Sequence, residues 1–209
     1  AMMSHELRTP LSAIAGYAEI LQLGIRGSLN PAQQGDLSRI QANQAHLLRI
    51  INDILDLTQV ESGQLVMHAQ QVALADVLAD IEPIVRPSID ECGIRYCVPE
   101  DSEVRLVADR ERLAQVLINL VANATRFTPA GGFVSVRLET TAGRARIRVV
   151  DSGVGIAPDA QDQVFLPFVQ GDSSASRSNQ GTGLGLTISR SLVEAMGGTL
   201  VLESELGVG

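Results

Sequence analysis

A histidine followed directly by a carboxylate stands near the start of the chain, in Ser4-His5-Glu6-Leu7-Arg8-Thr9-Pro10-Leu11. The Glu6 carboxylate can orient the imidazole of His5 and take its second ring proton, which leaves the other ring nitrogen free to attack phosphorus. Thr9 lies four residues on, so in a helix its hydroxyl shares the face of the histidine. A lone histidine on a helix is more often an ordinary surface or core residue. The chemical interpretation therefore depends on a phosphate source elsewhere in the chain.

Two asparagines four residues apart, Asn119 and Asn123, project from one face of a predicted helix. Their neighbours are apolar, which places the amides on the wall of an otherwise buried helix. A pair of solvated surface amides is the alternative. Amide oxygens suit Mg²⁺, which keeps several waters and takes substrate phosphates as further ligands. Arg126 and Phe127 close the same segment.

Asp151 follows directly after a predicted strand, and Gly153 and Gly155 come next. Its carboxylate can accept a hydrogen bond from an adenine amine, while the glycines let the backbone approach the ring. A tight turn without a ligand is the alternative. Two aromatic residues, Phe165 and Phe168, follow and are candidates to anchor a mobile segment, although ordinary core packing fits them equally well.

The segment Gly181-Thr182-Gly183-Leu184-Gly185 opens the last predicted helix. Free backbone N–H groups and the positive end of the helix dipole make such a segment a seat for phosphates. It lacks the Lys-Ser/Thr of a Walker A loop, and no strand leads directly into it as in a Rossmann fingerprint. Arg177, in the polar stretch before this segment, is the candidate to reach the γ-phosphate; a solvated loop arginine is the alternative.

Two helices must position the histidine. Apolar residues recur at steps of three and four in both, and we expect Pro10 to disturb the first. The second is predicted from Pro31 to near Ser62-Gly63. The seam positions are Leu7, Leu11, Ile14, Ala18, Leu21 and Ile25 in the first and Leu37, Ile40, Gln44, Leu47, Ile51, Ile54 and Thr58 in the second. Such a hairpin buries its stripes most simply with a second copy, as a four-helix bundle; packing against the rest of its own chain is the alternative.

The remainder of the chain interleaves strands and helices, which indicates a mixed sheet with helices on one face. Strands are predicted around Leu65–Met67, Val72, Ile94–Val98, Val104–Val107, 133–138, 145–150 and Thr199–Leu202, and helices over 74–91, 110–126 and 184–196. Pro83 and Pro87 should kink or end the first of these helices early. Gly143 marks a hairpin between the two strands with strict alternation.

Composition excludes several classes of function. The net charge of −8, the scattered cations and an aromatic content of 3% disfavour nucleic-acid binding. Cys92 and Cys97 are too few for a disulfide framework and lack further ligands for a metal site. No apolar run is long enough to cross a bilayer and no leader opens the chain, so we expect no membrane contact within this fragment and a cytoplasmic location. Membrane attachment of the parent protein is left open.

Taken in order, the five motifs resemble those of sensor histidine kinases: the phospho-acceptor box and the N, G1, F and G2 boxes. The resemblance implies a dimerisation and histidine-phosphotransfer domain over 1–63 and a catalytic ATP-binding domain over 64–209. The second is an α/β sandwich of the type shared with DNA gyrase B and MutL, and its last strand is expected to be missing. The resemblance also implies that Asn123 contacts Mg²⁺ and that Asn119 supports either the Mg²⁺ or the phosphates, with Arg126 where the family usually has lysine. The implied nucleotide-binding residues are Asn119, Asn123, Arg126, Phe127, Asp151, Gly153, Gly155, Phe165, Phe168, Arg177, Gly181, Thr182, Gly183, Leu184 and Gly185.

The resemblance implies an ATP- and Mg²⁺-dependent kinase that phosphorylates its own His5, with Glu6 acting as the base. The phosphate would then pass to an aspartate of a response-regulator receiver domain. Glu6 with Thr9 also resembles the family's phosphatase motif. Homodimerisation through the helical hairpin is expected. Two alternatives stay open: an ATPase of the same fold that does conformational work, and a dimeric docking scaffold with a weakened nucleotide site.

Overall fold

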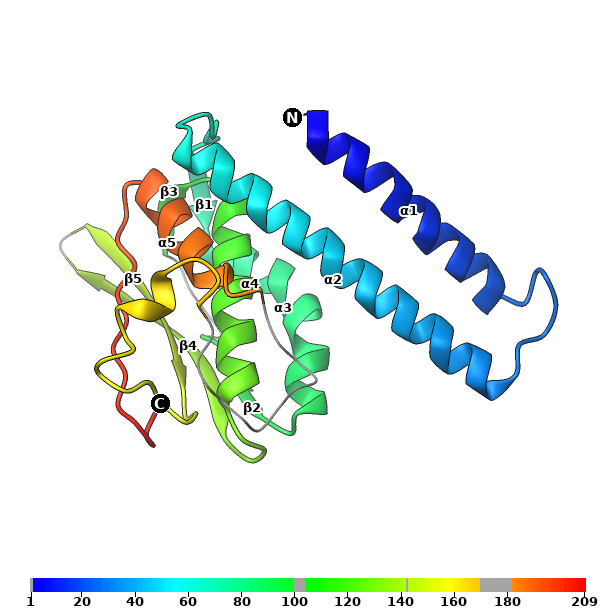
Figure 1. The fold of residues 1–209 in the computed structure, drawn as a ribbon. Coiled ribbons are helices and arrows are strands. Elements are labelled where there is room, and N and C mark those ends of the chain that lie inside the picture. The colour runs from blue at the N-terminus through cyan, green and yellow to red at the C-terminus, as the bar shows by residue number, and fades with distance from the viewer. Residues whose placement is uncertain (1, 100–103, 142, 170–181) are drawn as a thin grey trace. The chain divides into compact units, whose positions relative to one another are not determined.

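The computed structural model describes residues 2–99, 104–141, 143–169 and 182–209 (Figure 1). The chain forms two compact units, Ala1–Ser62 and Gly63–Gly209. The first contains two long helices, and the second is built from strands and shorter helices. Each unit is described by itself.

The first unit is a hairpin of α1 (Met2–Gln22) and α2 (Pro31–Glu61). α1 continues through Pro10, so the predicted disturbance does not end it. A proline ring removes one backbone donor, here the N–H that would bond to the carbonyl of Glu6, and the neighbouring turns hold the helix. The Nη2 of Arg8 donates to Oδ1 of Asn52 at 3.2 Å and so links the two helices.

The start of α2 carries a complete capping box. The backbone N–H of Gln33 donates to Oδ1 of Asn30 at 2.9 Å, and the backbone N–H of Asn30 donates to Oε1 of Gln33 at 3.0 Å. Pro31 occupies the first turn, where its missing N–H has no intrahelical partner in any case. Local sequence therefore fixes where α2 begins.

The hairpin buries little apolar surface. Leu11, Ala18 and Leu37 are buried, with only 4% to 8% of the surface of each residue exposed. Many other seam residues remain exposed. The exposed seam residues are Leu7, Ile14, Leu21, Ile25, Ile40, Leu47 and Ile54. In one copy of the chain, the two apolar stripes therefore stay largely open to solvent.

The second unit contains two sheets. In the smaller, β1 (Gln70–Ala73) pairs antiparallel with β3 (Arg105–Ala108). In the larger, the strand order is β2-β4-β5, with β2 (Arg95–Cys97) parallel to β4 (Phe133–Thr141) and β5 (Arg144–Asp151) antiparallel to β4. The predicted mixed sheet is confirmed.

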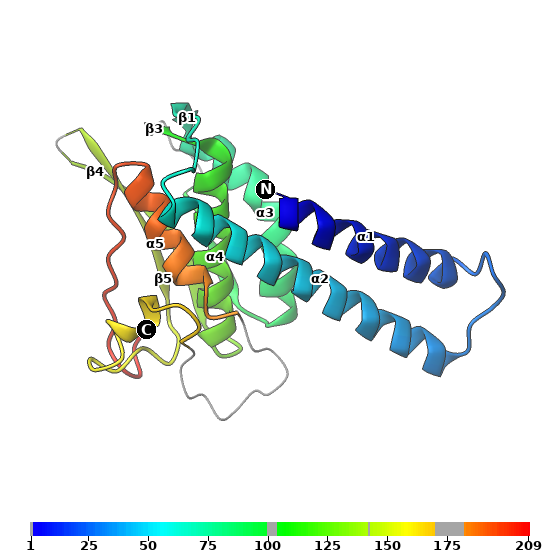
Figure 2. The ribbon, with the colours of Figure 1, turned by 45° about the horizontal axis from the view of Figure 1, so that its top comes forward.

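Helices cover one face of the larger sheet (Figures 1 and 2). They are α3 (Leu74–Glu91), α4 (Arg110–Phe127) and α5 (Gly185–Ala195), with a short 3-10 helix η1 (Gln163–Phe165) beside α5. The core lies between α3, α4 and the sheet, where residues such as Ile81, Val121 and Val134 have no exposed surface. Asp109 caps α4 by accepting from the backbone N–H groups of Glu111 and Arg112.

Three local predictions were wrong. Residues 65–67 form no strand, and β1 begins three residues later, at Gln70, where pairing with β3 becomes available. Residues 199–202 are not a strand, because no backbone hydrogen bond joins them to β5 in the part of the chain that the structure describes. α3 does not end early at Pro83 or Pro87 but runs to Glu91, since its apolar face is packed against the core.

Candidate functional site

The start of α5 lies against the middle of α4, and this contact defines the candidate site. A Cβ placed on Gly185 would lie 3.8 Å from Cγ of Asn119 and 4.0 Å from Nδ2 of Asn123. Both amides are half-buried, as expected for residues on the wall of a packed helix. Two motifs far apart in the sequence thus meet at one point, where a side chain larger than hydrogen on residue 185 would face the amides.

The turn before α5 has a backbone that only glycine adopts easily. Gly183 has φ +70°, and a Cβ there would lie 2.9 Å from the backbone of Phe168. The carbonyl of Gly183 accepts from the N–H of Phe168 at 3.0 Å, and the N–H of Leu184 donates to Oγ1 of Thr182 at 3.1 Å. Leu184 is fully buried and anchors the turn. Gly181 lies outside the described residues.

The Asp151 turn joins the end of β5 to the end of α4. Oδ1 of Asp151 accepts from the N–H of Gly153 at 2.8 Å, and the N–H of Val154 donates to the carbonyl of Phe127 at 3.3 Å. A Cβ on Gly153 would come within 2.6 Å of that Oδ1 and 2.7 Å of that carbonyl. The carboxylate makes no other hydrogen bond within the described ranges, so its second oxygen remains available to a ligand.

The C-terminal segment closes over the second glycine of this turn. Gly155 has φ +67°, and the backbone of Glu205 occupies the position that a Cβ would take. The N–H of Gly207 donates to the carbonyl of Val154 at 2.8 Å, and the N–H of Ile156 donates to Oγ of Ser204 at 2.8 Å. Gly155 is therefore required by packing of the loop, whatever it does for a ligand.

The two aromatic residues predicted at the site, Phe165 and Phe168, differ in burial. Phe165 is 7% exposed, its carbonyl accepts from Oγ1 of Thr187 at 2.8 Å, and the guanidinium of Arg190 lies 3.6 Å from its ring centroid. Phe168 is 64% exposed and has φ +64°, an unusual value for a residue with a side chain. Phe165 thus fastens the loop to α5. The contributions of Thr187 and Arg190 were missed, because neither residue type nor spacing marks them.

Arg126 lies on the exposed side of α4 with its guanidinium 5.3 Å from the ring centroid of Phe127. Desolvation by burial lowers the pKa of Arg126, and the group stays charged at neutral pH. No carboxylate pairs with it among the residues described, which leaves its donors available to an anion.

The histidine motif is described only in part. His5 lies in α1, but its side chain, like the whole of Arg177, is outside what the structure describes. Glu6 and Thr9 are exposed on α1. The geometry of the nucleotide motifs is therefore a property of the second unit alone.

A divalent cation here would depend on the asparagines. Within the described ranges no three His, Cys, Asp or Glu side chains are grouped to hold a metal. The half-buried amide of Asn123 beside Gly185 suits a cation that brings its own waters and phosphate ligands, as Mg²⁺ does. Among the described helices, none is long and apolar enough to span a bilayer.

Comparison with known proteins assigns both units to described families. Residues 1–63 match the model of the His Kinase A (phospho-acceptor) domain, and residues 108–209 match that of the histidine kinase-, DNA gyrase B- and HSP90-like ATPases. The chain is 34% identical over its whole length to the autoinducer 2 sensor kinase/phosphatase LuxQ of Vibrio parahaemolyticus, of which it spans 25%.

Two solved structures extend this similarity. Full-length ShkA in complex with AMPPNP is 33% identical, with a TM-score of 0.80 over 100% of this chain and 43% of that one. Histidine kinase ThkA in complex with response regulator protein TrrA is 26% identical, with a TM-score of 0.61 over 95% of this chain and 54% of that one. In both cases the similarity includes the two units described above.

Proposed function

The chain belongs to the sensor histidine kinases, with a phospho-acceptor region and an ATPase-type domain, and from that premise we propose that it uses ATP to phosphorylate its own His5. The observation that carries the proposal is the meeting of Gly185 with Asn119 and Asn123. A glycine-rich helix start facing two amides supplies N–H donors for phosphates and oxygen ligands for their counter-ion in one place.

The nucleotide would bind between α4, α5 and the Asp151 turn. The free carboxylate oxygen of Asp151 accepts from the adenine amine, and Gly153 keeps the backbone low enough for the ring to approach. The α5 N-terminus faces the phosphates, and Arg126 contributes positive charge from α4. The AMPPNP in the ShkA complex supports an adenine nucleotide as ligand.

Phosphoryl transfer follows from this placement. A ring nitrogen of His5 attacks the γ-phosphorus in line, the bond to the β–γ bridging oxygen breaks, and ADP leaves. Glu6 holds and takes the second ring proton. Asn123 would hold Mg²⁺, which neutralises charge on the phosphates; positioning and electrostatics do the rest.

The phospho-histidine would then donate its phosphate to an aspartate of a response regulator. A P–N bond is labile, and the ThkA–TrrA complex supports a regulator as the partner. Thr9 lies one helical turn after His5. Its hydroxyl would orient a water molecule that removes the phosphate from the aspartate of the regulator. The kinase/phosphatase name of LuxQ supports that second activity.

Dimerisation through the hairpin completes the proposal. Ile14, Ile40 and Leu47 are between 45% and 46% exposed in one copy, although they belong to regular apolar stripes. Pairing two hairpins into a four-helix bundle would cover these residues. The boundary between the dimerising region and the catalytic domain then falls near Gly63.

The direct test is incubation with γ-labelled ATP and Mg²⁺. We expect acid-labile, base-stable label on the wild-type chain, none on His5→Gln, and full labelling of His46→Gln, a histidine of α2 outside the motif. Label that survives in His5→Gln would exclude this histidine as the acceptor. ATP binding without labelling of the wild-type would favour an ATPase or a scaffold instead.

A second pair of variants addresses the amides. Asn123→Ala should abolish labelling, whereas Asn43→Ala on the exposed side of α2 should leave it unchanged. Nucleotide titration with and without Mg²⁺ separates binding of the phosphates from binding of the cation. If Asn123→Ala loses only the gain in nucleotide affinity that Mg²⁺ provides, Asn123 binds the cation. Unchanged labelling of Asn123→Ala would contradict the placement of the site.

A further inference from the structure

The face of the larger sheet that points away from the helices is unusual in composition. On β4, Val134 and Val136 are buried against the helices, so Phe133, Ser135, Arg137 and Glu139 occupy the opposite face. Strand register adds residues from β2 and β5 to the same face. The arginines gathered there are Arg95 beside Phe133, Arg137, Arg148 opposite Arg137, Arg146 opposite Glu139, and Arg144 opposite Thr141.

This concentration of positive charge contrasts with the chain as a whole. The net charge is −8, and the 16 cationic residues, all arginine, include five on this one face. Within the described ranges only Arg148 of the five has carboxylate partners, Glu139 at 3.9 Å and Glu203 at 3.8 Å. Arg137 and Arg148 stand directly opposite each other, and like charges in this position cost stability unless carboxylates offset them. Glu139 and Glu203 offset the charge of Arg148, whereas that of Arg137 has no such partner within the described ranges.

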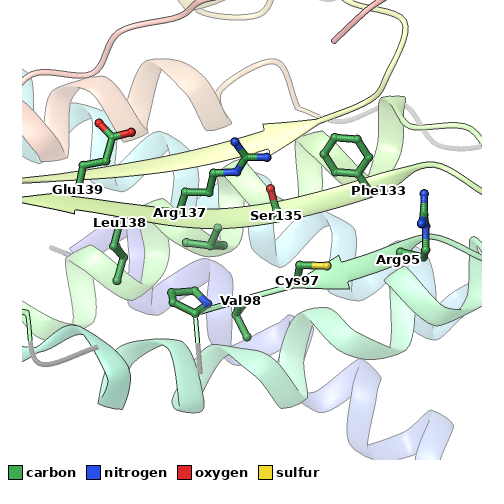
Figure 3. A pocket seen from close by; sticks show the side chains of 10 residues that line it. Arg95, Cys97, Val98, Phe133, Ser135, Arg137, Leu138 and Glu139 are labelled. Carbon is green, nitrogen blue, oxygen red and sulfur yellow. The ribbon is translucent and has the colours of Figure 1, made fainter. Parts of the chain in front are cut away.

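A hollow of about 690 Å³ opens beside β2 and β4 (Figure 3). Residues from both faces of β4 line it, and the ones that belong to the face described here include Arg95, Cys97, Phe133, Ser135 and Arg137. None of the predicted nucleotide-binding residues is among the lining. The Oγ of Ser135 is buried, so this residue forms part of the floor of the hollow and leaves the arginines as its polar contacts for a ligand.

We propose that this sheet face docks an acidic segment of a partner protein, whose carboxylates pair with Arg95 and Arg137 beside the hollow. Guanidinium groups bind carboxylates in a bidentate manner, and neither of these two arginines has a carboxylate partner within the described ranges. The apolar part of Phe133 suits a hydrophobic side chain next to the acidic one. This surface is independent of the kinase chemistry proposed above.

The chemistry of the face favours discrete carboxylates over a continuous array of phosphates. Glu139 lies among the arginines, opposite Arg146 and 3.9 Å from Arg148, so the positive charge of the face is interrupted. A short segment that places single acidic side chains against Arg95 and Arg137 fits this interrupted charge, whereas a nucleic acid or a layer of anionic headgroups presents evenly repeated phosphates.

Fluorescence anisotropy of a labelled peptide that alternates glutamate and leucine tests the proposal on the full chain. Arg95→Glu/Arg137→Glu should weaken binding at least about tenfold, because each loses a charge-assisted bond. Arg39→Glu/Arg49→Glu makes the same change of net charge on exposed positions of α2 and should change the affinity less than about threefold.

Equal losses in the two double variants would overturn the proposal. So would tighter binding to phosphatidylserine vesicles or to single-stranded DNA than to the peptide at the same salt concentration. If Arg95→Glu/Arg137→Glu does not fold, Arg137→Gln takes its place. The decrease of wild-type affinity with rising salt concentration then measures how much of the binding depends on charge. Labelling with γ-labelled ATP should persist in every variant of this face, so failure of docking and failure of the kinase assignment are separable.

Discussion

The helical hairpin and the α/β unit differ in how much of their apolar surface one copy of the chain can bury. Of the hairpin's seam residues, Leu11, Ala18 and Leu37 are buried, while most of the others stay exposed. The α/β unit encloses a continuous core in which Ile81, Val121 and other large side chains have no exposed surface. The α/β unit therefore buries its core within one copy, whereas the hairpin leaves most of its apolar stripes uncovered.

The largest expected effect comes from the core of the α/β unit. Leu192 of α5 is fully buried, and Leu192→Ala should lower the free energy of unfolding of this unit by about 2–5 kcal/mol, through lost burial and a cavity. Ile14→Ala, at a seam position 45% exposed in one copy, should change the unfolding of dilute protein by less than about 1 kcal/mol. Urea unfolding followed by circular dichroism measures both. Equal losses would mean that the hairpin is self-sufficient.

Self-association of the chain should depend on the seam of the hairpin. Ile40→Asp on α2 should weaken self-association by about 2–3 kcal/mol, since each copy would bring a charge into the buried seam. Sedimentation equilibrium over a range of concentrations measures this loss. Asn43→Asp adds the same charge at an exposed position of the same helix and serves as the control. A chain that stays monomeric at all concentrations before mutation would break the comparison.

Nucleotide affinity should depend on the α/β unit without help from the hairpin. Gly185→Ala leaves its Cβ at ordinary contact distance from Asn119 and Asn123, so folding should be unaffected. The methyl group would nevertheless occupy the space facing the amides and should lower the affinity for a fluorescent ATP analogue about tenfold, near 1.4 kcal/mol. Gly16→Ala, which meets open space on α1, should change neither quantity. If Gly185→Ala bound the analogue as tightly as the wild type, the phosphates would have to bind elsewhere.

The smallest effect concerns pH and the start of α4. Burial of Asp109 by itself raises the pKa of its carboxyl, but backbone N–H bonds from His68, Arg112 and Glu111 outweigh it and hold the pKa below its usual value. A carboxyl with a lowered folded-state pKa stabilises the fold above its unfolded pKa of about 3.9, and that stability is lost as the pH falls through the folded value.

Asp109→Asn should therefore flatten the acid limb of the stability curve. It should also cost about 1 kcal/mol at neutral pH, because both carboxylate oxygens accept backbone N–H bonds and the amide nitrogen that replaces one of them cannot. Unfolding free energies measured between neutral pH and about pH 3 check this, with Asp36→Asn on the exposed start of α2 as control. An acid limb of the same slope in Asp109→Asn would contradict the assignment.

The sequence predicted the elements that are set by apolar periodicity. α3 and α4 begin and end within a residue of the prediction, because their apolar faces repeat without interruption. Residues 199–202 show the same kind of alternation but form no strand, since a strand also needs a backbone partner that pattern cannot reveal. The prolines of α1 and α3 were overestimated as breaks, because packing outweighs one lost hydrogen bond.

The candidate site was predictable in its residue types but not in its contacts. The spacing of Asn119 and Asn123 indicates a shared helix face, yet only the packing of α5 on α4 shows that Gly185 faces them. Likewise, nothing in the sequence indicates that Arg190 stacks on Phe165, or that Phe168 adopts a left-handed backbone. Contacts between distant segments depend on the tertiary arrangement, which a single sequence does not encode locally.

The capping box at Asn30 and Gln33 has a consequence for the order of assembly. Helix nucleation is the slow, costly step, and a box that satisfies two backbone donors beside Pro31 lowers this cost using local residues alone. α2 can thus start in a lone chain, and the short loop then brings α1 back along it within the same molecule. The encounter of two copies would join preformed hairpins, so the bimolecular step carries less of the ordering entropy.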